Sequence, residues 1–194
     1  MPKTVKTVET LKIGYWINEL LKNKNTGVLI IGGAGTGKST IIEECLSNMI
    51  EDYDISRISL SYYTDSLTLQ SMLEDSIEKK VGNQYGPNRK KNLIYYLNDL
   101  NAPNADEYQT VQAHAILRQY FDHKHWYDRQ KLTLKVIENS QYIASIKPNI
   151  GNVINQRLQR HFSKFAISFP TQVDKKWIVC KSGSTNQKLL IKAN

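Results

Sequence analysis

At residues 32–39 the chain reads Gly32-Gly33-Ala34-Gly35-Thr36-Gly37-Lys38-Ser39, which matches the pattern G-x-x-x-x-G-K-[ST] at every fixed position. A polyphosphate needs many aligned N–H donors, and glycines let the backbone approach it closely. In this pattern the lysine, Lys38, reaches the outer phosphates and the hydroxyl of Ser39 binds Mg²⁺. We therefore predict that this stretch and the following Thr40 bind ATP or ADP together with Mg²⁺.

The residues on both sides of the loop support this prediction. Residues 28–31 form a short apolar run that is typical of a buried strand. After the loop, apolar residues recur at helical spacing: Ile42, Cys45, Leu46 and Met49. A helix that begins at the loop adds its unpaired amides and the positive end of its dipole to phosphate binding. The context favours a phosphate-binding loop over a chance glycine-rich turn.

The length of 194 residues predicts one domain, or one domain with a tail. The two cysteines, Cys45 and Cys180, have no C-x-x-C spacing, so neither a zinc site nor a disulfide framework is indicated. No apolar run approaches 18 residues, and the first residues lack the apolar region of a signal peptide. We expect a cytoplasmic protein with no membrane contact, and Cys45 as an inert apolar residue of its helix.

The net charge of +8 suits an anionic partner such as a nucleotide, a nucleic acid or an acidic protein surface. The basic residues are scattered in short runs, however, and no basic stripe alternates with aromatic residues. We therefore expect most of this charge to lie on a solvated surface and do not expect nucleic-acid binding.

Other patterns place further elements along the chain. Thr7 predicts the start of a first helix, and Asp65 or Ser66 predicts the start of a later helix that extends to Ile77. The first helix is expected to carry its apolar residues on one face: Ile13, Trp16, Ile17, Leu20 and Leu21. Alternation predicts a strand over 58–63, and the segments 93–97, 142–144 and 162–169 are further strand candidates. Short helices are expected over 113–120 and 155–161, and an exposed connection over 81–92.

Strands that alternate with helices indicate an α/β fold with a doubly wound, mostly parallel sheet. Ligands of such folds bind at the carboxyl ends of the strands. The wholly apolar strand 93–97 ends in Asn98-Asp99, so we expect these two side chains to lie beside the phosphate-binding loop.

Four stretches together resemble the third AAA+ module of axonemal dynein heavy chains, with the nearest likeness to outer-arm, β-type chains. They are 83–87 (NQYGP), 98–103 (NDLNAP), 125–135 (HWYDRQKLTLK) and 157–162 (RLQRHF), and the likeness extends from about residue 4 to residue 170. The resemblance implies a P-loop NTPase of AAA+ type over 1–170, within a motor whose six modules form a ring. It also implies ATP, Mg²⁺ and the other modules of the ring as partners, microtubules as indirect partners, and the cytoskeleton of the cilium as location.

The chain departs from the family pattern at the end of strand 93–97. Where the family carries an acidic pair, this chain has Asn98-Asp99, so the carboxylate that supports Mg²⁺ from the second shell is replaced by the amide of Asn98. Asp99 occupies the position of the catalytic base that polarises the attacking water. It is either that base or a strand-end residue satisfied by loop amides.

A second departure concerns the sensor position, where the family usually has asparagine and this chain has Lys147. Lysine has three donors and no acceptor, so it can hold a phosphate but cannot accept a hydrogen bond from the attacking water. We expect this chain to bind nucleotide and to hydrolyse it weakly or not at all.

The resemblance also marks Arg157 and Arg160 as candidates to reach the nucleotide of a neighbouring module, with a surface or helix-end role as the alternative. Nothing after Pro170 resembles the helical lid of AAA+ modules, and residues 171–194 are expected to form a loosely ordered tail. A fragment, a truncated product and a decayed copy of a motor all fit this pattern.

Three other interpretations compete with an ATPase module. The chain is alternatively a non-catalytic scaffold or interaction domain that keeps the fold of a motor module. A small kinase would need an acceptor-substrate pocket, for which no residues stand out. Asp122, His123, His125 and Asp128 suggest a metal cluster, but the H-x-H spacing has no second half, and a structural role is preferred for this segment.

Overall fold

The computed structural model describes residues 7–23, 27–87, 91–148 and 151–169. The elements are α1 (Val8–Lys22), β1 (Gly27–Gly32), α2 (Lys38–Ser47), β2 (Tyr53–Ser59), α3 (Ser66–Glu74), β3 (Ile77–Lys79), β4 (Gln84–Pro87), β5 (Asn92–Asn98), α4 (Gln112–His123), β6 (His125–Tyr127), β7 (Leu134–Ile137), β8 (Ser140–Ile146), α5 (Gln156–Gln159) and β9 (Phe162–Ile167). The expected tail, Cys180 and the segment where a lid would follow lie outside the described residues.

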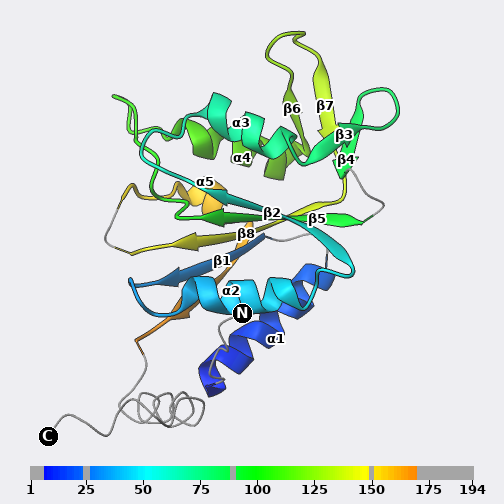
Figure 1. The fold of residues 1–194 in the computed structure, drawn as a ribbon. Helices are drawn as coiled ribbons and strands as arrows, with labels where there is room; N and C mark the ends of the chain where they lie inside the picture. The colour runs from blue at the N-terminus through cyan, green and yellow to red at the C-terminus, as the bar shows by residue number, and fades with distance from the viewer. Residues whose placement is uncertain (1–6, 24–26, 88–90, 149–150, 170–194) are drawn as a thin grey trace, which may run out of the picture.

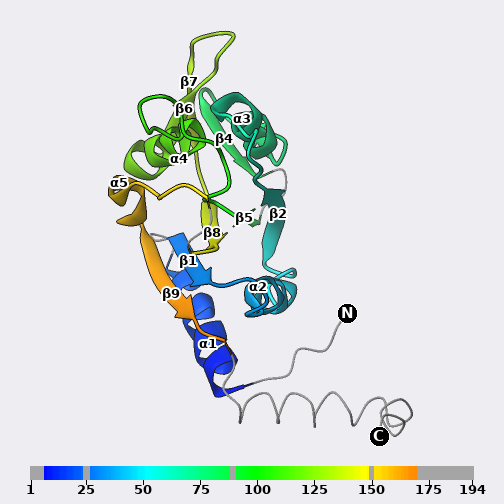
Figure 2. The same cartoon turned by 90° about the vertical axis from the view of Figure 1, so that its left-hand side faces the viewer.

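Five parallel strands form the main sheet in the order β2-β5-β8-β1-β9. Helices α1 and α2 cover one face, and α3 and α4 cover the other (Figures 1 and 2). Because both faces are covered, the inner strands are almost wholly apolar, as in β5, where residues 93–97 are all buried. This confirms the predicted α/β fold with a doubly wound, mostly parallel sheet.

Alternation along β1 shows how the two faces are packed. Leu29 joins the core beneath α3 and α4, whereas Val28 and Ile30 join the core that α1 and α2 cover. The predicted apolar face of α1 is buried at Ile13, Ile17 and Leu21, whereas Trp16, which was expected on the same face, is 53% exposed. No helix in the described part of the chain has both the length and the apolar character that a membrane span requires.

The predicted helix starts are confirmed at two positions. Thr7 caps α1 through a reciprocal pair of hydrogen bonds with Thr10. Asp65 caps α3 by accepting a hydrogen bond from the Thr68 amide. The expected continuation of α3 to Ile77 is wrong, because the helix ends at Glu74 and Ile77 begins β3 as a buried residue.

The predicted strand over 58–63 is also misplaced, because β2 runs from Tyr53 to Ser59. Its parallel partner β5 ends at Asn98, opposite Ser59, so the ladder has no further partner to pair with. Beyond this point the chain leaves the sheet in a turn in which the Ser61 amide donates to Thr64 Oγ1. The alternating residues Tyr62 and Tyr63 are exposed.

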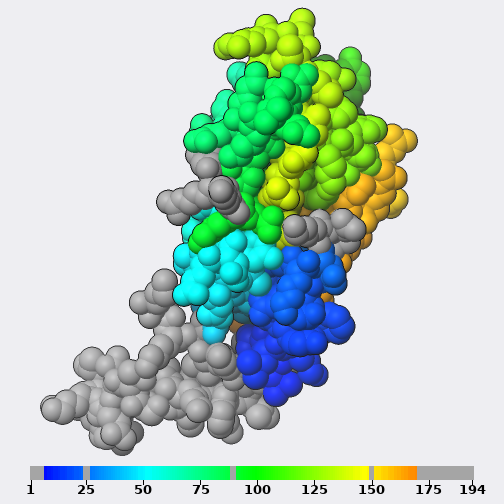
Figure 3. Space-filling model, turned by 90° about the vertical axis from the view of Figure 1, so that its right-hand side faces the viewer, coloured from blue at the N-terminus to red at the C-terminus, as the bar shows by residue number. Residues whose placement is uncertain are grey.

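The expected exposed connection over 81–92 instead contributes to a second sheet, of order β3-β4-β7-β6. A turn with Gly82 at φ 60° joins β3 to β4, and β4 pairs with β7 from a distant part of the chain. The strand β7 was not predicted, and the expected short helix over 113–120 extends as α4 to His123. The β6–β7 hairpin projects at the end of the molecule opposite α1 (Figures 1 and 3).

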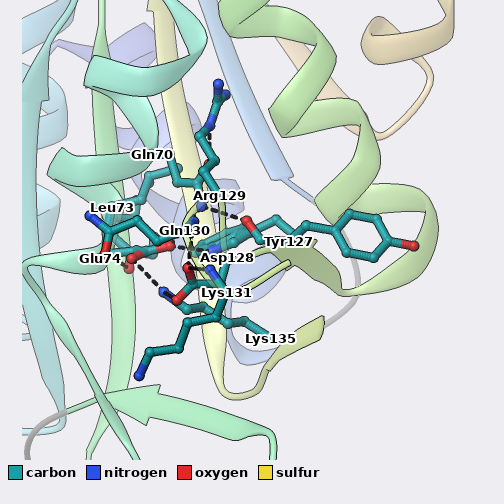
Figure 4. Close-up of polar contacts among 11 residues, drawn as sticks. Gln70, Leu73, Glu74, Tyr127, Asp128, Arg129, Gln130, Lys131 and Lys135 are labelled. Carbon is teal, nitrogen blue, oxygen red and sulfur yellow. Dashed lines mark hydrogen bonds and ion pairs between the residues drawn. The ribbon is translucent and has the colours of Figure 1, made fainter. Parts of the chain in front are cut away.

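A partly buried ion cluster attaches this hairpin to α3 (Figure 4). Lys135 on β7 lies 2.8 Å from the carboxylate of Glu74 on α3 and 3.0 Å from that of Asp128 in the hairpin turn. The indole N–H of Trp126 on β6 donates to the same Glu74 carboxylate at 2.8 Å. These contacts give the 125–135 stretch a structural role, as the sequence analysis preferred.

Three tyrosines from neighbouring elements meet beneath α4. Tyr95 on β5 stacks on Tyr142 on β8 with ring centroids 5.0 Å apart, and Tyr142 also contacts Tyr120. The Tyr95 hydroxyl donates to the Leu73 carbonyl at 2.6 Å, whereas the buried Tyr142 hydroxyl has no hydrogen-bond partner among the described residues. Burial raises the pKa of all three phenols, so each stays neutral.

This difference between two stacked rings predicts opposite effects of the same substitution. Tyr142→Phe removes an unpaired buried hydroxyl and should raise the free energy of unfolding by about 1 kcal/mol, whereas Tyr95→Phe removes a bonded hydroxyl and should lower it by about 1 kcal/mol. Urea denaturation of both variants measures these changes. A loss of stability in Tyr142→Phe would contradict the assignment of its hydroxyl as unpaired.

Candidate nucleotide-binding site

The phosphate-binding loop lies between the carboxyl end of β1 and the start of α2. Gly32 is the last residue of β1, residues 33–37 form the loop, and Lys38, Ser39 and Thr40 form the first turn of α2. Gly35 and Gly37 have φ values of 78° and 85°, a region that residues with a side chain rarely adopt. These two glycines therefore have a conformational role, in addition to the close approach to phosphate for which they were predicted.

The first turn of α2 has no side-chain cap. The starts of α1, α3 and α5 are each capped by a side chain, whereas the N-cap residues of α2 and α4, Gly37 and Val111, provide no such cap. The first amides of a helix lack partners within the helix, and those of α2 combine with the positive end of the helix dipole. This arrangement suits a bound phosphate group.

The side chain of Lys38 folds back into the phosphate-binding loop. Its ammonium group donates to the carbonyl oxygens of Gly32 and Gly33, each at 2.7 Å, and the residue is only 7% exposed. Burial lowers the pKa of Lys38, repulsion from Lys147 lowers it further, and attraction to Asp99 partly offsets both effects. The ammonium is thus held at the loop by two neutral acceptors, both of which a phosphate oxygen can replace.

The acidic-pair position at the end of β5 carries the neutral amide of Asn98. Its side-chain oxygen accepts a hydrogen bond of 2.7 Å from the hydroxyl of Ser145 on β8. The hydroxyl of Tyr96 lies 3.3 Å from the same oxygen and 3.4 Å from the hydroxyl of Ser39. The structure thus places Asn98 and Ser39 around one tyrosine hydroxyl.

The donor set fits a polyphosphate better than it fits Mg²⁺. The ion prefers carboxylate and other oxygen ligands and usually retains several waters. Ser39 supplies one hydroxyl, but the nearest residue of the acidic-pair position is an amide whose oxygen already accepts from Ser145. Within the described residues, no group of three or more His, Cys, Asp or Glu side chains could hold a metal ion.

Asp99 and Lys147 form an ion pair at the edge of the site. The Lys147 ammonium lies 3.0 Å from a carboxylate oxygen of Asp99, and the two side chains are 38% and 26% exposed. Asp99 has φ of 55°, in the left-handed region, and its amide donates to Ser145 Oγ at 3.3 Å. The sequence analysis proposed separate roles for these two residues, whereas the structure brings their side chains into contact.

The segment that carries Asp99 is anchored to two other elements. The Leu100 amide donates to the Ser145 carbonyl at 2.9 Å, which fixes the segment to β8. On the other side, Nε2 of the buried His114 on α4 donates to the Leu100 carbonyl at 2.7 Å. Burial lowers the pKa of His114, and this backbone hydrogen bond opposes the shift.

The two candidate arginines lie at α5, away from these groups. Arg157 is exposed on the helix, and the Arg160 guanidinium donates to the Asp122 carboxylate at the end of α4. That hydrogen bond lowers the pKa of the Asp122 carboxyl, and His161 contacts the same carboxylate at 3.0 Å. The structure therefore shows a structural partner for Arg160 within this chain.

Sequence reasoning missed three residues that shape the site. Ser145 is fully buried and bonds to both Asn98 and Asp99, Tyr96 links Asn98 to Ser39, and His114 holds the segment after Asp99. A serine near the carboxyl end of the apolar strand 140–146 was the one signal in the sequence. The partners of Tyr96 and His114 depend on contacts that no local pattern reveals.

A hollow of about 920 Å³ lies elsewhere, between α3, α4 and β6. Its lining includes Gln70, Arg118 and His125 and no residue of the phosphate-binding loop. The loop is preferred as the functional site because its backbone conformation, its uncapped helix and its lysine all serve one ligand class.

Together, the fold and this loop define a P-loop nucleotide-binding protein of the α/β class. The family model described as the P-loop containing dynein motor region matches residues 3–170. The chain belongs to this family.

Curated relatives support the same assignment. The chain is 48% identical over 170 residues to mouse dynein axonemal heavy chain 17 and 47% identical over 169 residues to the ciliary dynein beta chain of Tripneustes gratilla. It is 38% identical over 170 residues to the flagellar outer-arm dynein alpha chain of Chlamydomonas reinhardtii. Each match covers 87% of this chain and about 4% of the length of the relative.

The buried His114, which bonds to the Leu100 carbonyl, predicts a specific pH dependence of stability. Because the folded-state pKa of His114 lies below its unfolded value near 6.5, the unfolded chain binds more protons, and stability should fall as the pH drops below about 6.5. This one group can change the free energy of unfolding by at most about 1.4 kcal/mol per pH unit. His114→Gln keeps a donor for the Leu100 carbonyl and should remove that part of the slope in denaturation series between pH 5 and 8.

His123→Gln is a matched control, since His123 is exposed at the end of α4. It should keep the slope of the unaltered chain. Equal slopes in the chain and in His114→Gln would show that His114 does not titrate differently on folding.

Proposed function

We propose that this chain is an ATP-binding AAA+ module of an axonemal dynein heavy chain. The finer assignment, to the third module of an outer-arm, β-type chain, rests on the four sequence stretches that resemble that module. The similarity to relatives named as axonemal, ciliary and flagellar outer-arm dyneins supports an assignment to axonemal dyneins. Their names also favour the axoneme of the cilium as the location.

The observation that carries the proposal is the loop between β1 and α2. It combines two glycines with positive φ, an uncapped helix start and the buried ammonium of Lys38 at one point. Phosphate oxygens provide the negative charge and the acceptors that these groups lack.

We propose further that hydrolysis is weak. Attack on the terminal phosphate needs a group that accepts a hydrogen bond from the water and holds it in line. In this chain Asp99 has one carboxylate oxygen occupied by Lys147, and neither Lys147 nor the amide of Asn98 replaces a missing carboxylate. Binding without rapid turnover agrees with a regulatory module that reports its nucleotide state to a ring.

As part of a motor, the module would contact other AAA+ modules and would affect microtubules only indirectly. Arg157 remains a proposed contact to the nucleotide of a neighbour because its side chain is exposed on α5. Arg160 would first have to leave Asp122, so we expect it to be the weaker candidate.

The proposal predicts that ATP stabilises the protein through Lys38. At a hundredfold excess of ATP over its dissociation constant, the free energy of unfolding should rise by about 2.7 kcal/mol. Lys38→Ala should weaken ATP binding by about 10- to 100-fold, since a charge-assisted hydrogen bond contributes about 1.5–3 kcal/mol. Calorimetric titration and thermal denaturation measure the two quantities.

Lys79→Ala provides the control, because it removes the same charge from an exposed position on β3. It should bind ATP as the unaltered chain does. If ATP does not change the thermal stability of the unaltered chain and its titration gives no heat of binding, the scaffold interpretation replaces the nucleotide-binding one.

The proposed block on hydrolysis predicts a gain of activity. Asn98→Asp combined with Lys147→Asn supplies a carboxylate at the acidic-pair position and frees the carboxylate of Asp99. The rate of phosphate release should rise by about tenfold or more, which equals about 1.4 kcal/mol of barrier. A rapid rate in the unaltered chain would contradict the proposed block.

A further inference from the structure

Two lysines follow neighbouring parallel strands at the edge of the sheet that carries the phosphate-binding loop. Lys38 follows β1 through the loop, and Lys147 directly follows β8. These strands pair in parallel with Ile31 opposite Ile146, so the register places the backbone of Lys147 beside Gly32. Lys147 is therefore positioned at the mouth of the loop that Lys38 enters.

The charges at this edge of the sheet do not balance. Lys38 and Lys147 contribute two positive charges, Asp99 contributes one negative charge, and Asn98 contributes none. The two lysines follow adjacent parallel strands, so their positive charges repel each other. An anion bound between them would relieve this repulsion, whereas a divalent cation would add to it.

The ion pair between Lys147 and Asp99 leaves the lysine free to exchange partners. Both side chains are partly exposed, and ion pairs of this kind contribute little to stability. The lysine stem has four flexible bonds and carries a compact charge with three donors. Its ammonium can thus exchange the Asp99 carboxylate for a phosphate oxygen without a large loss.

The same edge is poorly built for Mg²⁺. The ion's expected support from a carboxylate is replaced by Asn98, whose oxygen accepts from Ser145 at 2.7 Å. The carboxylate of Asp99 is the remaining negative group among these residues, and it is paired with Lys147. Asn98 therefore gives no charge to the metal, and Asp99, which has the charge, is paired with the second lysine, Lys147.

We propose that Lys147 is a phosphate ligand that supplies the charge neutralisation which Mg²⁺ otherwise provides, so that the site binds ATP with little dependence on a divalent cation. The inference rests on the proposed nucleotide binding and defines its chemistry. In this arrangement Lys38 and Lys147 hold the polyphosphate from two sides, and Asp99 holds Lys147 in place when no nucleotide is bound.

The test is a comparison of ATP dissociation constants, measured by calorimetric titration in Mg²⁺ and in EDTA. In the unaltered chain the two constants should agree within about threefold. Lys147→Asn should weaken binding in EDTA by about tenfold, about 1.4 kcal/mol, and should weaken it much less in Mg²⁺. Asn98→Asp combined with Lys147→Asn should make binding clearly dependent on Mg²⁺.

Lys79→Asn is the matched control for net charge and should leave both constants unchanged. Thermal denaturation of each variant without nucleotide shows whether it is folded, and ADP titrations show how much of the effect depends on the third phosphate. A tenfold loss of affinity on removing Mg²⁺ from the unaltered chain, with the same ratio in Lys147→Asn, would overturn the inference and leave nucleotide binding intact. If ATP binds in neither condition, the proposed function itself is wrong.

Discussion

The parallel pairing of β1, β8 and β5 is the constraint on which the site depends. Because three neighbouring strands run in the same direction, their carboxyl ends meet at one edge of the sheet. One end carries the phosphate-binding loop, one carries Asn98 and Asp99, and one carries Lys147. The buried Ser145 on β8 holds the ends of β5 and β8 together, since it bonds to both Asn98 and Asp99. A change in this pairing would separate the groups whatever their chemical identity.

The position of the loop between a strand and a helix could be predicted because its determinants are local. Glycines at 35 and 37, the lysine and the flanking apolar runs all lie within about 20 residues, and the structure shows each in its expected place. The layered α/β fold and the position of Asp99 at a strand end could also be predicted, because the run 93–97 is wholly apolar. The resemblance added the expectation of weak hydrolysis, which stays a proposal.

The remaining features depend on contacts between distant parts of the chain. The end of β2 is set by the length of its partner β5, not by the alternation that continues to Tyr63. The second sheet joins strands of three or four residues, and strands so short give little periodic signal. The ion pair of Asp99 with Lys147 links residues 48 positions apart, and it changes how both must be interpreted.

The central claim is that the backbone amides of the loop and of the first turn of α2 bind a polyphosphate. Hydrogen–deuterium exchange of the whole chain, with and without ATP, tests this claim most directly. The account predicts that ATP slows exchange of the amides in residues 33–40 and changes the β6–β7 hairpin little. Unchanged exchange in 33–40 at saturating ATP, or protection confined to another part of the chain, would contradict it.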